Sequence, residues 1–170
     1  QYSGYTSTGT PAKTMELQYL YGESGTKEYI GGSIRTNSDF VRAQILSVET
    51  IDLKMTLIEG QDAGVAANYI ITAKSLDRTK SEVLNDLNQI TRSSSKSYEI
   101  IDGKNGFIEG DWTKGINESD FLLFTGNTTY YSDYNYYGSA GTIITDDYIF
   151  EDSLNKYTNH SVVNREYDIV

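Results

Sequence analysis

The chain has 170 residues, with 14 Lys and Arg against 24 Asp and Glu, and it contains no Cys. This length is sufficient for one domain with its own core, and the lack of Cys excludes disulfides, thiol catalysis, zinc fingers and iron–sulfur clusters. The net charge of −10 opposes contact with phosphate groups, so neither nucleic acid nor an anionic membrane is expected as a partner.

Residues 1–14 form a small, polar N-terminal segment, and residues 15–170 are expected to fold as a single globular domain. A segment of this composition is ordered only where its own domain or a neighbouring molecule holds it. We therefore expect residues 1–14 to act as a pairing or donor strand, with Tyr2 and Tyr5 in the interface. Because the chain begins at Gln1 rather than Met, we also expect that an export signal has been removed.

Alternation of apolar and polar residues predicts strands in the first half of the chain. Met15 to Tyr21 alternates in this way, and Thr50 to Ile58 is the clearest strand, with Asp, Lys and Thr between its apolar residues. Two further strands are predicted over Phe40 to Ser47 and Asn68 to Lys74.

A helix is predicted next, over about residues 76–92. Apolar residues recur there at helical spacing, namely Leu76, Val83, Leu84, Leu87 and Ile90. Thr79 and Glu82 have the spacing of a capping box, in which side chains satisfy the first amide groups of a helix. We expect this single amphipathic helix to pack on one face of the sheet.

A hairpin is predicted after the helix, with strands over Tyr98 to Ile101 and Phe107 to Trp112 and a glycine-containing turn over Asp102 to Gly106. The turn has some resemblance in composition to a calcium loop. However, Ile101 and Trp112 stand where an EF-hand loop has its first and last acidic ligands, so the hairpin is the favoured interpretation.

Later strands are predicted over Asp120 to Phe124 and Gly141 to Thr145, whereas Asp146 to Val163 is ambiguous between helix and strand. The order of elements predicts an α+β, mainly β fold. We expect a mostly antiparallel sheet or sandwich with the one amphipathic helix packed on it.

Tyrosine is concentrated in Thr128 to Gly138, which holds five of the fifteen tyrosines of the chain: Tyr130, Tyr131, Tyr134, Tyr136 and Tyr137. In a continuous strand, Tyr130, Tyr134 and Tyr136 would share one face. Three interpretations stay open: a polar sheet covered by cross-strand rings, a surface that contacts other protein copies, and a platform for a glycan or small ligand.

Acidic pairs near the C-terminus form a candidate metal site, made of Asp146, Asp147, Glu151 and Asp152. Ca²⁺ is the cofactor that such a loose cluster of oxygens would bind, because it accepts six to eight oxygen ligands in flexible geometry. The alternative is a solvated acidic face.

Three N-x-Ser/Thr sequons begin at Asn117, Asn127 and Asn159, and they are compatible with a glycosylated surface protein. His160 is the single histidine, so a Ser–His–acid triad would have to use it. No nucleophile elbow, dinucleotide fingerprint or phosphate-binding loop occurs in the sequence.

These features favour a non-enzymatic structural subunit of an extracellular or cell-surface assembly, such as a filament, pilus or coat. The subunits would join through N-terminal strand addition and tyrosine-rich surfaces, with other copies of the chain as partners. The alternatives are an exported module that binds a glycan or small ligand, and a hydrolase of unrecognised type. No apolar run reaches 18 residues, so no membrane span is expected.

Overall fold

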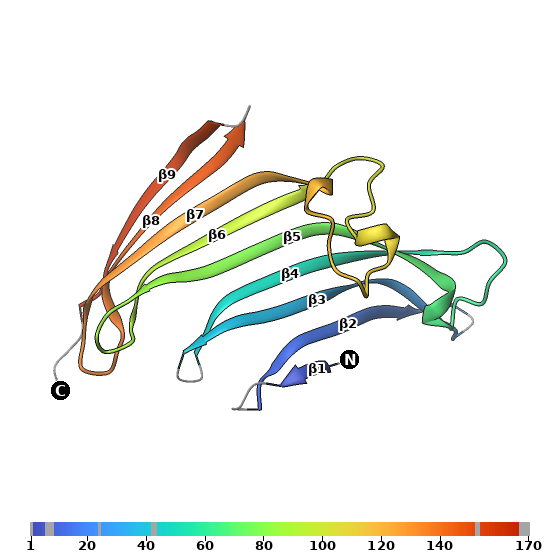
Figure 1. The fold of residues 1–170 in the computed structure, drawn as a ribbon, viewed down its shortest axis with the longest axis horizontal. Coiled ribbons are helices and arrows are strands. Elements are labelled where there is room, and N and C mark those ends of the chain that lie inside the picture. Colours follow the sequence, from blue (N-terminus) through green and yellow to red (C-terminus); the bar gives the residue numbers. More distant parts are fainter. Residues whose placement is uncertain (1, 6–8, 24, 42–43, 152–153, 167–170) are drawn as a thin grey trace. The chain divides into compact units, whose positions relative to one another are not determined.

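The computed structural model describes residues 2–5, 9–23, 25–41, 44–151 and 154–166. Nine strands form one antiparallel sheet, and each strand lies beside the one that precedes it in the chain (Figure 1). The strands are β1 (Tyr2–Tyr5), β2 (Pro11–Tyr21), β3 (Lys27–Val41), β4 (Gln44–Leu57), β5 (Tyr69–Leu84), β6 (Ile90–Ile100), β7 (Phe121–Tyr134), β8 (Ala140–Glu151) and β9 (Leu154–Asn164). Three short 3-10 turns, Ala66–Asn68, Ile108–Gly110 and Glu118–Asp120, complete the described elements.

The expectation of a mainly β, antiparallel fold is confirmed, but the predicted helix over residues 76–92 is wrong. That stretch is instead the end of β5, a tight turn and the start of β6. The residues of the expected capping box bond across the two strands. Glu82 pairs with Arg92 at 3.0 Å and accepts a hydrogen bond from Ser94 at 2.9 Å, while the hydroxyls of Thr79 and Ser95 lie 3.2 Å apart.

Contacts divide the chain into two compact units. The first unit comprises residues 1–38, 48–77 and 98–122, and the second comprises residues 39–47, 78–97 and 123–170. Several strands therefore contribute one part to each unit. The units differ in how their sheet is covered, and this difference determines where a binding site can lie.

The first unit has a conventional core on one face of its sheet. Buried apolar side chains from five strands form it, together with one loop residue: Met15, Ile34, Ile51, Leu53, Ala73, Leu76, Phe121 and the loop residue Phe107. The predicted alternation of β4 is confirmed, because Ile51, Leu53 and Met55 are all buried. The segment between β6 and β7, residues 101–120, covers this face, and its Trp112 and Ile116 pack against the cluster.

This covering segment is not the predicted hairpin. Instead of a strand over Phe107 to Trp112, it has a single bridge between Phe107 and Ile116 and two 3-10 turns. The buried carboxylate of Asp120 organises it by accepting hydrogen bonds from the Gly106 amide and the Asn117 side chain, each at 3.1 Å. This irregular backbone allows Phe107 to enter the core from a loop rather than from a strand of the sheet.

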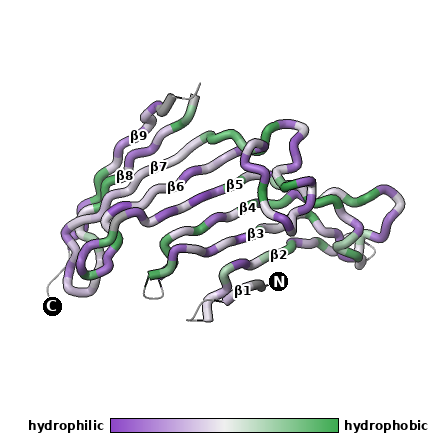
Figure 2. Tube along the Cα trace, in the orientation of Figure 1, coloured by the Kyte–Doolittle hydropathy of each residue, from purple (hydrophilic) through white to green (hydrophobic). Residues whose placement is uncertain are grey.

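The second unit has no such cover. Ala140 is the one buried apolar side chain among its described residues. Figure 2 shows that β5 and β6 are mostly hydrophilic along the parts that belong to this unit. Aromatic rings provide part of the packing: the ring of Tyr148 lies over Gly126 and contacts Phe150 at a centroid distance of 5.1 Å. A sheet open on both faces does not require strict alternation, which is why its strands are hard to recognise from sequence.

The two ends of the chain provide the edge strands of the sheet. The C-terminal stretch that was ambiguous between helix and strand forms the end of β8 and β9. The N-terminal segment contains β1, which pairs with β2 of the same chain in the register Tyr2 with Thr14 and Tyr5 with Pro11. Within the described residues, no helix has the length and apolar character needed to cross a bilayer.

Candidate functional site

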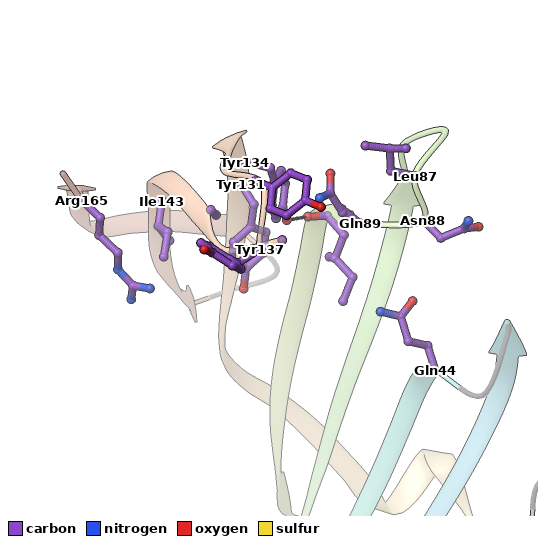
Figure 3. A pocket seen from close by; sticks show the side chains of 13 residues that line it. Gln44, Leu87, Asn88, Gln89, Tyr131, Tyr134, Tyr137, Ile143 and Arg165 are labelled. Atoms are coloured by element: carbon purple, nitrogen blue, oxygen red, sulfur yellow. Dashed lines mark hydrogen bonds between the residues drawn. The ribbon is translucent and has the colours of Figure 1, made fainter. Parts of the chain in front are cut away.

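A hollow of about 680 Å³ lies in the second unit, at the end of the sheet where two hairpin turns stand side by side. One turn joins β5 to β6 and the other joins β7 to β8. Figure 3 shows Tyr131, Tyr134 and Tyr137 gathered near Gln89, with Leu87 to one side and Arg165 to the other. The hollow therefore combines four of the five tyrosines of the predicted tyrosine run with residues from outside it, since Tyr136 also lines it.

The turn between β5 and β6 is built around Asn85. Its amide oxygen accepts hydrogen bonds from the backbone amides of Leu87 and Gln89, both at 3.0 Å. Its carbonyl accepts a bond from Asn88, which has a left-handed φ of 58°. Asn is one of the few side chains that tolerates this conformation, so the sequence Asn-x-x-Asn specifies the turn.

The turn between β7 and β8 repeats this pattern around Asn135. Its side chain accepts bonds from the amides of Tyr137 at 3.0 Å and Ser139 at 2.9 Å, and its carbonyl accepts one from Gly138, whose φ is 79°. The two turns thus place Leu87 and Tyr137 at equivalent positions on the two sides of the hollow. The turn residues Tyr136 and Tyr137 are 97% and 86% exposed.

Two tyrosines of β7 are fixed within the wall of the hollow. The hydroxyl of Tyr134 donates to the carbonyl of Ile90, and the hydroxyls of Tyr131 and Ser93 lie 3.3 Å apart. Burial raises the pKa of Tyr134 above its ordinary value of 10.0, and nearby Tyr131 acts in the same direction. The phenol therefore keeps its proton at neutral pH and remains a hydrogen-bond donor.

Polar side chains complete the lining. The amides of Gln44, Asn88 and Gln89 and the guanidinium of Arg165 line the hollow, and its described lining includes no carboxylate. None of these four residues is predicted as a site residue from the sequence. Asn88 and Gln89 were assigned to a helix, although the repeated Asn-x-x-Asn/Gly pattern could have identified both turns.

The tyrosines predicted to share one face of a strand, Tyr130, Tyr134 and Tyr136, do not all line the hollow. Tyr130 and Tyr131 lie on opposite faces of β7, as alternation requires, and Tyr130 lies near Arg92 rather than in the hollow. Asp133 has a left-handed φ of 55°, which interrupts the alternation and brings Tyr134 to the same hollow as Tyr131. Tyr5 is exposed on β1, and Tyr2 belongs to the same strand.

The candidate calcium ligands do not converge in the described part of the chain. Asp146 contacts His160 at 2.6 Å and Asp147 accepts a bond from Asn159 at 3.1 Å. Adjacent strand residues point to opposite faces, so these two carboxylates cannot share one ion. Glu151 ends β8 and Asp152 lies outside the described residues, and no group of three or more His, Asp or Glu side chains suited to a metal is present elsewhere in the described chain.

The three sequons differ in accessibility. Asn117 is partly buried and bonded to Asp120, and Asn127 is partly buried on β7. Asn159 is exposed on the edge strand β9. Its side-chain nitrogen donates to Asp147 on β8, so a glycan on Asn159 would rise from a face of the sheet.

His160 contacts Asp146, but a neighbouring nucleophile does not complete a triad. Ser161 follows His160 in β9 and pairs with Thr145, whereas His160 pairs with Asp146. Successive strand residues face opposite sides of the sheet, so Ser161 points away from the imidazole. This geometry gives no support to a hydrolase built on His160.

Acid is expected to weaken the β7–β8 hairpin through Asp133. Hydrogen bonds from Thr142 and Ser132 hold the pKa of Asp133 below its ordinary value of 3.8. Their stabilisation is therefore present above pH 3.8 and is lost as the pH falls through the lower value of the folded state. We expect Asp133→Asn, which tolerates the same backbone conformation, to unfold more easily than the native chain at neutral pH. The difference should shrink as the pH falls below 3.8, as measured by urea unfolding, and a difference independent of pH would contradict this assignment.

Comparison of the chain with family models, with curated proteins and with solved structures gives no match.

Proposed function

We propose that the chain is a non-enzymatic structural subunit of an extracellular assembly, in which the β9 edge of one copy pairs with the β2 edge of the next. The observation that carries this proposal is a nine-stranded sheet with two different edges, one formed by β1 and β2 and the other by β9. These three strands together contain a single acidic residue. The Gly-, Ser-, Thr-, Asn- and Tyr-rich composition supports an extracellular location.

The edge at β9 is long and weakly protected. It spans eleven residues, pairs only with β8 in the described chain, and exposes Tyr157, Val162 and Val163. The outer backbone groups of an edge strand are available to another strand unless charges, prolines or covering segments block them. β9 carries Lys156 and one bulge but no Asp or Glu.

The other edge is only partly closed. β1 covers Pro11 to Thr14 of β2, and no partner strand on that side is described for Glu16 to Tyr21. This uncovered part exposes Tyr19, Leu20 and Tyr21, and two of these rings pack edge to face with centroids 5.6 Å apart. The joint is therefore the uncovered part of β2, rather than the N-terminal segment that the sequence predicts as the donor strand.

Charge distribution is consistent with such a joint. The chain has 24 acidic residues, yet Glu16 is the only one on β1, β2 and β9 taken together. Repulsion between copies of net charge −10 is therefore weakest where the two edges would meet. Because the two edges are different surfaces, their pairing is heterologous and adds copies in one direction, as in a filament.

We expect a lysine on either edge to prevent assembly. Val162→Lys on β9 and Leu20→Lys on β2 place a charge where an incoming strand would pack. Each should raise the protein concentration needed for assembly at least tenfold, measured by analytical ultracentrifugation and electron microscopy. Val65→Lys is the matched control, since Val65 is 45% exposed, against 50% for Val162, and lies in the β4–β5 loop.

A mixture of the two edge variants tests the direction of pairing. Each variant retains one intact edge, so an equimolar mixture should form dimers but no longer species. If Leu20→Lys alone still formed dimers, the joint would be β9 with β9 and the heterologous filament would be excluded. A native chain that remains monomeric at every concentration would overturn the proposed function.

A further inference from the structure

The hollow of the second unit has the construction of a preformed ligand site. Two turns with the same hydrogen-bond pattern frame it. In each turn an asparagine side chain accepts hydrogen bonds from two backbone amides. The wall rings of Tyr131 and Tyr134 are held by their hydroxyl contacts. Groups fixed before binding lose little conformational entropy when a ligand arrives.

The chemistry of the lining narrows the class of ligand. Aromatic rings present a negative face, which attracts the partly positive C–H groups on the face of a pyranose ring. Amide groups such as those of Gln44, Asn88 and Gln89 can both donate and accept hydrogen bonds, as sugar hydroxyls also do. The oxygen of Gln89 already accepts one from Asn85 at 2.8 Å. Arg165 adds a planar fork of donors that can reach two neighbouring oxygens.

We propose that this hollow binds a neutral saccharide, with Tyr136 and Tyr137 as stacking rings and Arg165 and the amides as hydrogen-bonding groups. A volume of about 680 Å³ lies within the range of small-molecule sites. An anionic ligand is disfavoured because the described lining holds one cation, in a chain of net charge −10. A purely apolar ligand would displace water from the polar groups of the lining without replacing its hydrogen bonds.

The test is isothermal titration of the native chain with maltohexaose, cellohexaose, mannohexaose and chitohexaose, and with hexagalacturonate as the anionic comparison. We expect at least one neutral oligosaccharide to bind and hexagalacturonate not to bind. Tyr137→Ala should weaken binding at least tenfold, because it removes a ring that is already solvent-exposed and so leaves the fold intact. Tyr5→Ala is the matched control, an exposed tyrosine outside the hollow whose loss should change affinity less than twofold.

Substitutions of Arg165 test whether the hollow recognises the hydroxyl groups of a ligand or its negative charge. Arg165→Gln and Arg165→Lys should both weaken binding, since neither keeps the fork of donors, and added salt should have little effect. Retained affinity in Arg165→Lys together with strong salt dependence would assign the hollow to an anion and overturn the proposal. Binding of no neutral oligosaccharide would also overturn it. In that case, loss of self-association in Tyr137→Ala would identify the hollow as a protein contact.

Discussion

Phe107→Ala is expected to lower the free energy of unfolding of the first unit by about 3–5 kcal/mol. Phe107 is only 2% exposed and belongs to the core cluster, although it comes from the segment between β6 and β7. Its loss would leave a cavity between this segment and the sheet, so neither surface could keep its contacts. Because the free energy of unfolding of a small domain is about 5–15 kcal/mol in total, this single change would remove a large fraction of it.

Trp112 provides the measurement for this prediction, since it is the only tryptophan and packs against the same core. Its fluorescence during urea unfolding reports on the first unit directly. Ile108→Ala is the matched control, because Ile108 is the next residue and is 42% exposed. We expect the control to change stability by less than about 1 kcal/mol. Equal effects of the two substitutions would show that Phe107 does not anchor the covering segment.

Strands of the first unit could be predicted because one of their faces is buried. Ile51, Leu53 and Met55 alternate with polar residues in β4, and the structure places all three in the interior. Burial on a single face produces the period of two on which strand recognition depends. The same logic explains the success at Met15 to Tyr21, where Met15 enters the core and Leu17 packs against it.

In the second unit the sequence predicts part of β8, over Gly141 to Thr145, but it does not predict the strands over residues 78–97. With both faces open to solvent, β5 and β6 have no reason to alternate, and cross-strand contacts such as Glu82 with Arg92 replace burial. The apolar residues between Leu76 and Ile90 happen to recur at helical spacing, and this spacing led to the incorrect prediction of a helix. The decisive signal was local: Asn85 begins a turn, and a left-handed residue at Asn88 cannot lie within a helix.

The candidate site was predicted only in part, for the same reason. Tyrosine enrichment identified Tyr131, Tyr134, Tyr136 and Tyr137, because composition is visible in one segment. The other side of the hollow comes from chain segments far away in sequence, including Arg165. Such neighbours follow from strand order and turn geometry, which a single sequence does not display.

Gly106→Ala is expected to destabilise the first unit by about 2–4 kcal/mol, as the sum of backbone strain and overpacking. Gly106 has a φ of 82°, in the region that residues with a side chain avoid. A methyl group there would lie 2.5 Å from Cβ of Ala73 and 3.0 Å from the ring of Phe121, both of which are buried. Neither neighbour is the end of a long flexible side chain, so the covering segment would have to move away from the sheet.

Gly103 offers a control that separates the two causes. It lies in the same segment with a φ of 75°, but a Cβ there would meet nothing within 4 Å. Gly103→Ala should therefore cost only the backbone term, about 1–2 kcal/mol, while Gly106→Ala costs the steric term in addition. Urea unfolding followed by Trp112 fluorescence measures both variants. Equal destabilisation of Gly106→Ala and Gly103→Ala would show that backbone strain alone explains both effects. Close contact of residues 101–120 with the sheet would then not be the reason for glycine at position 106.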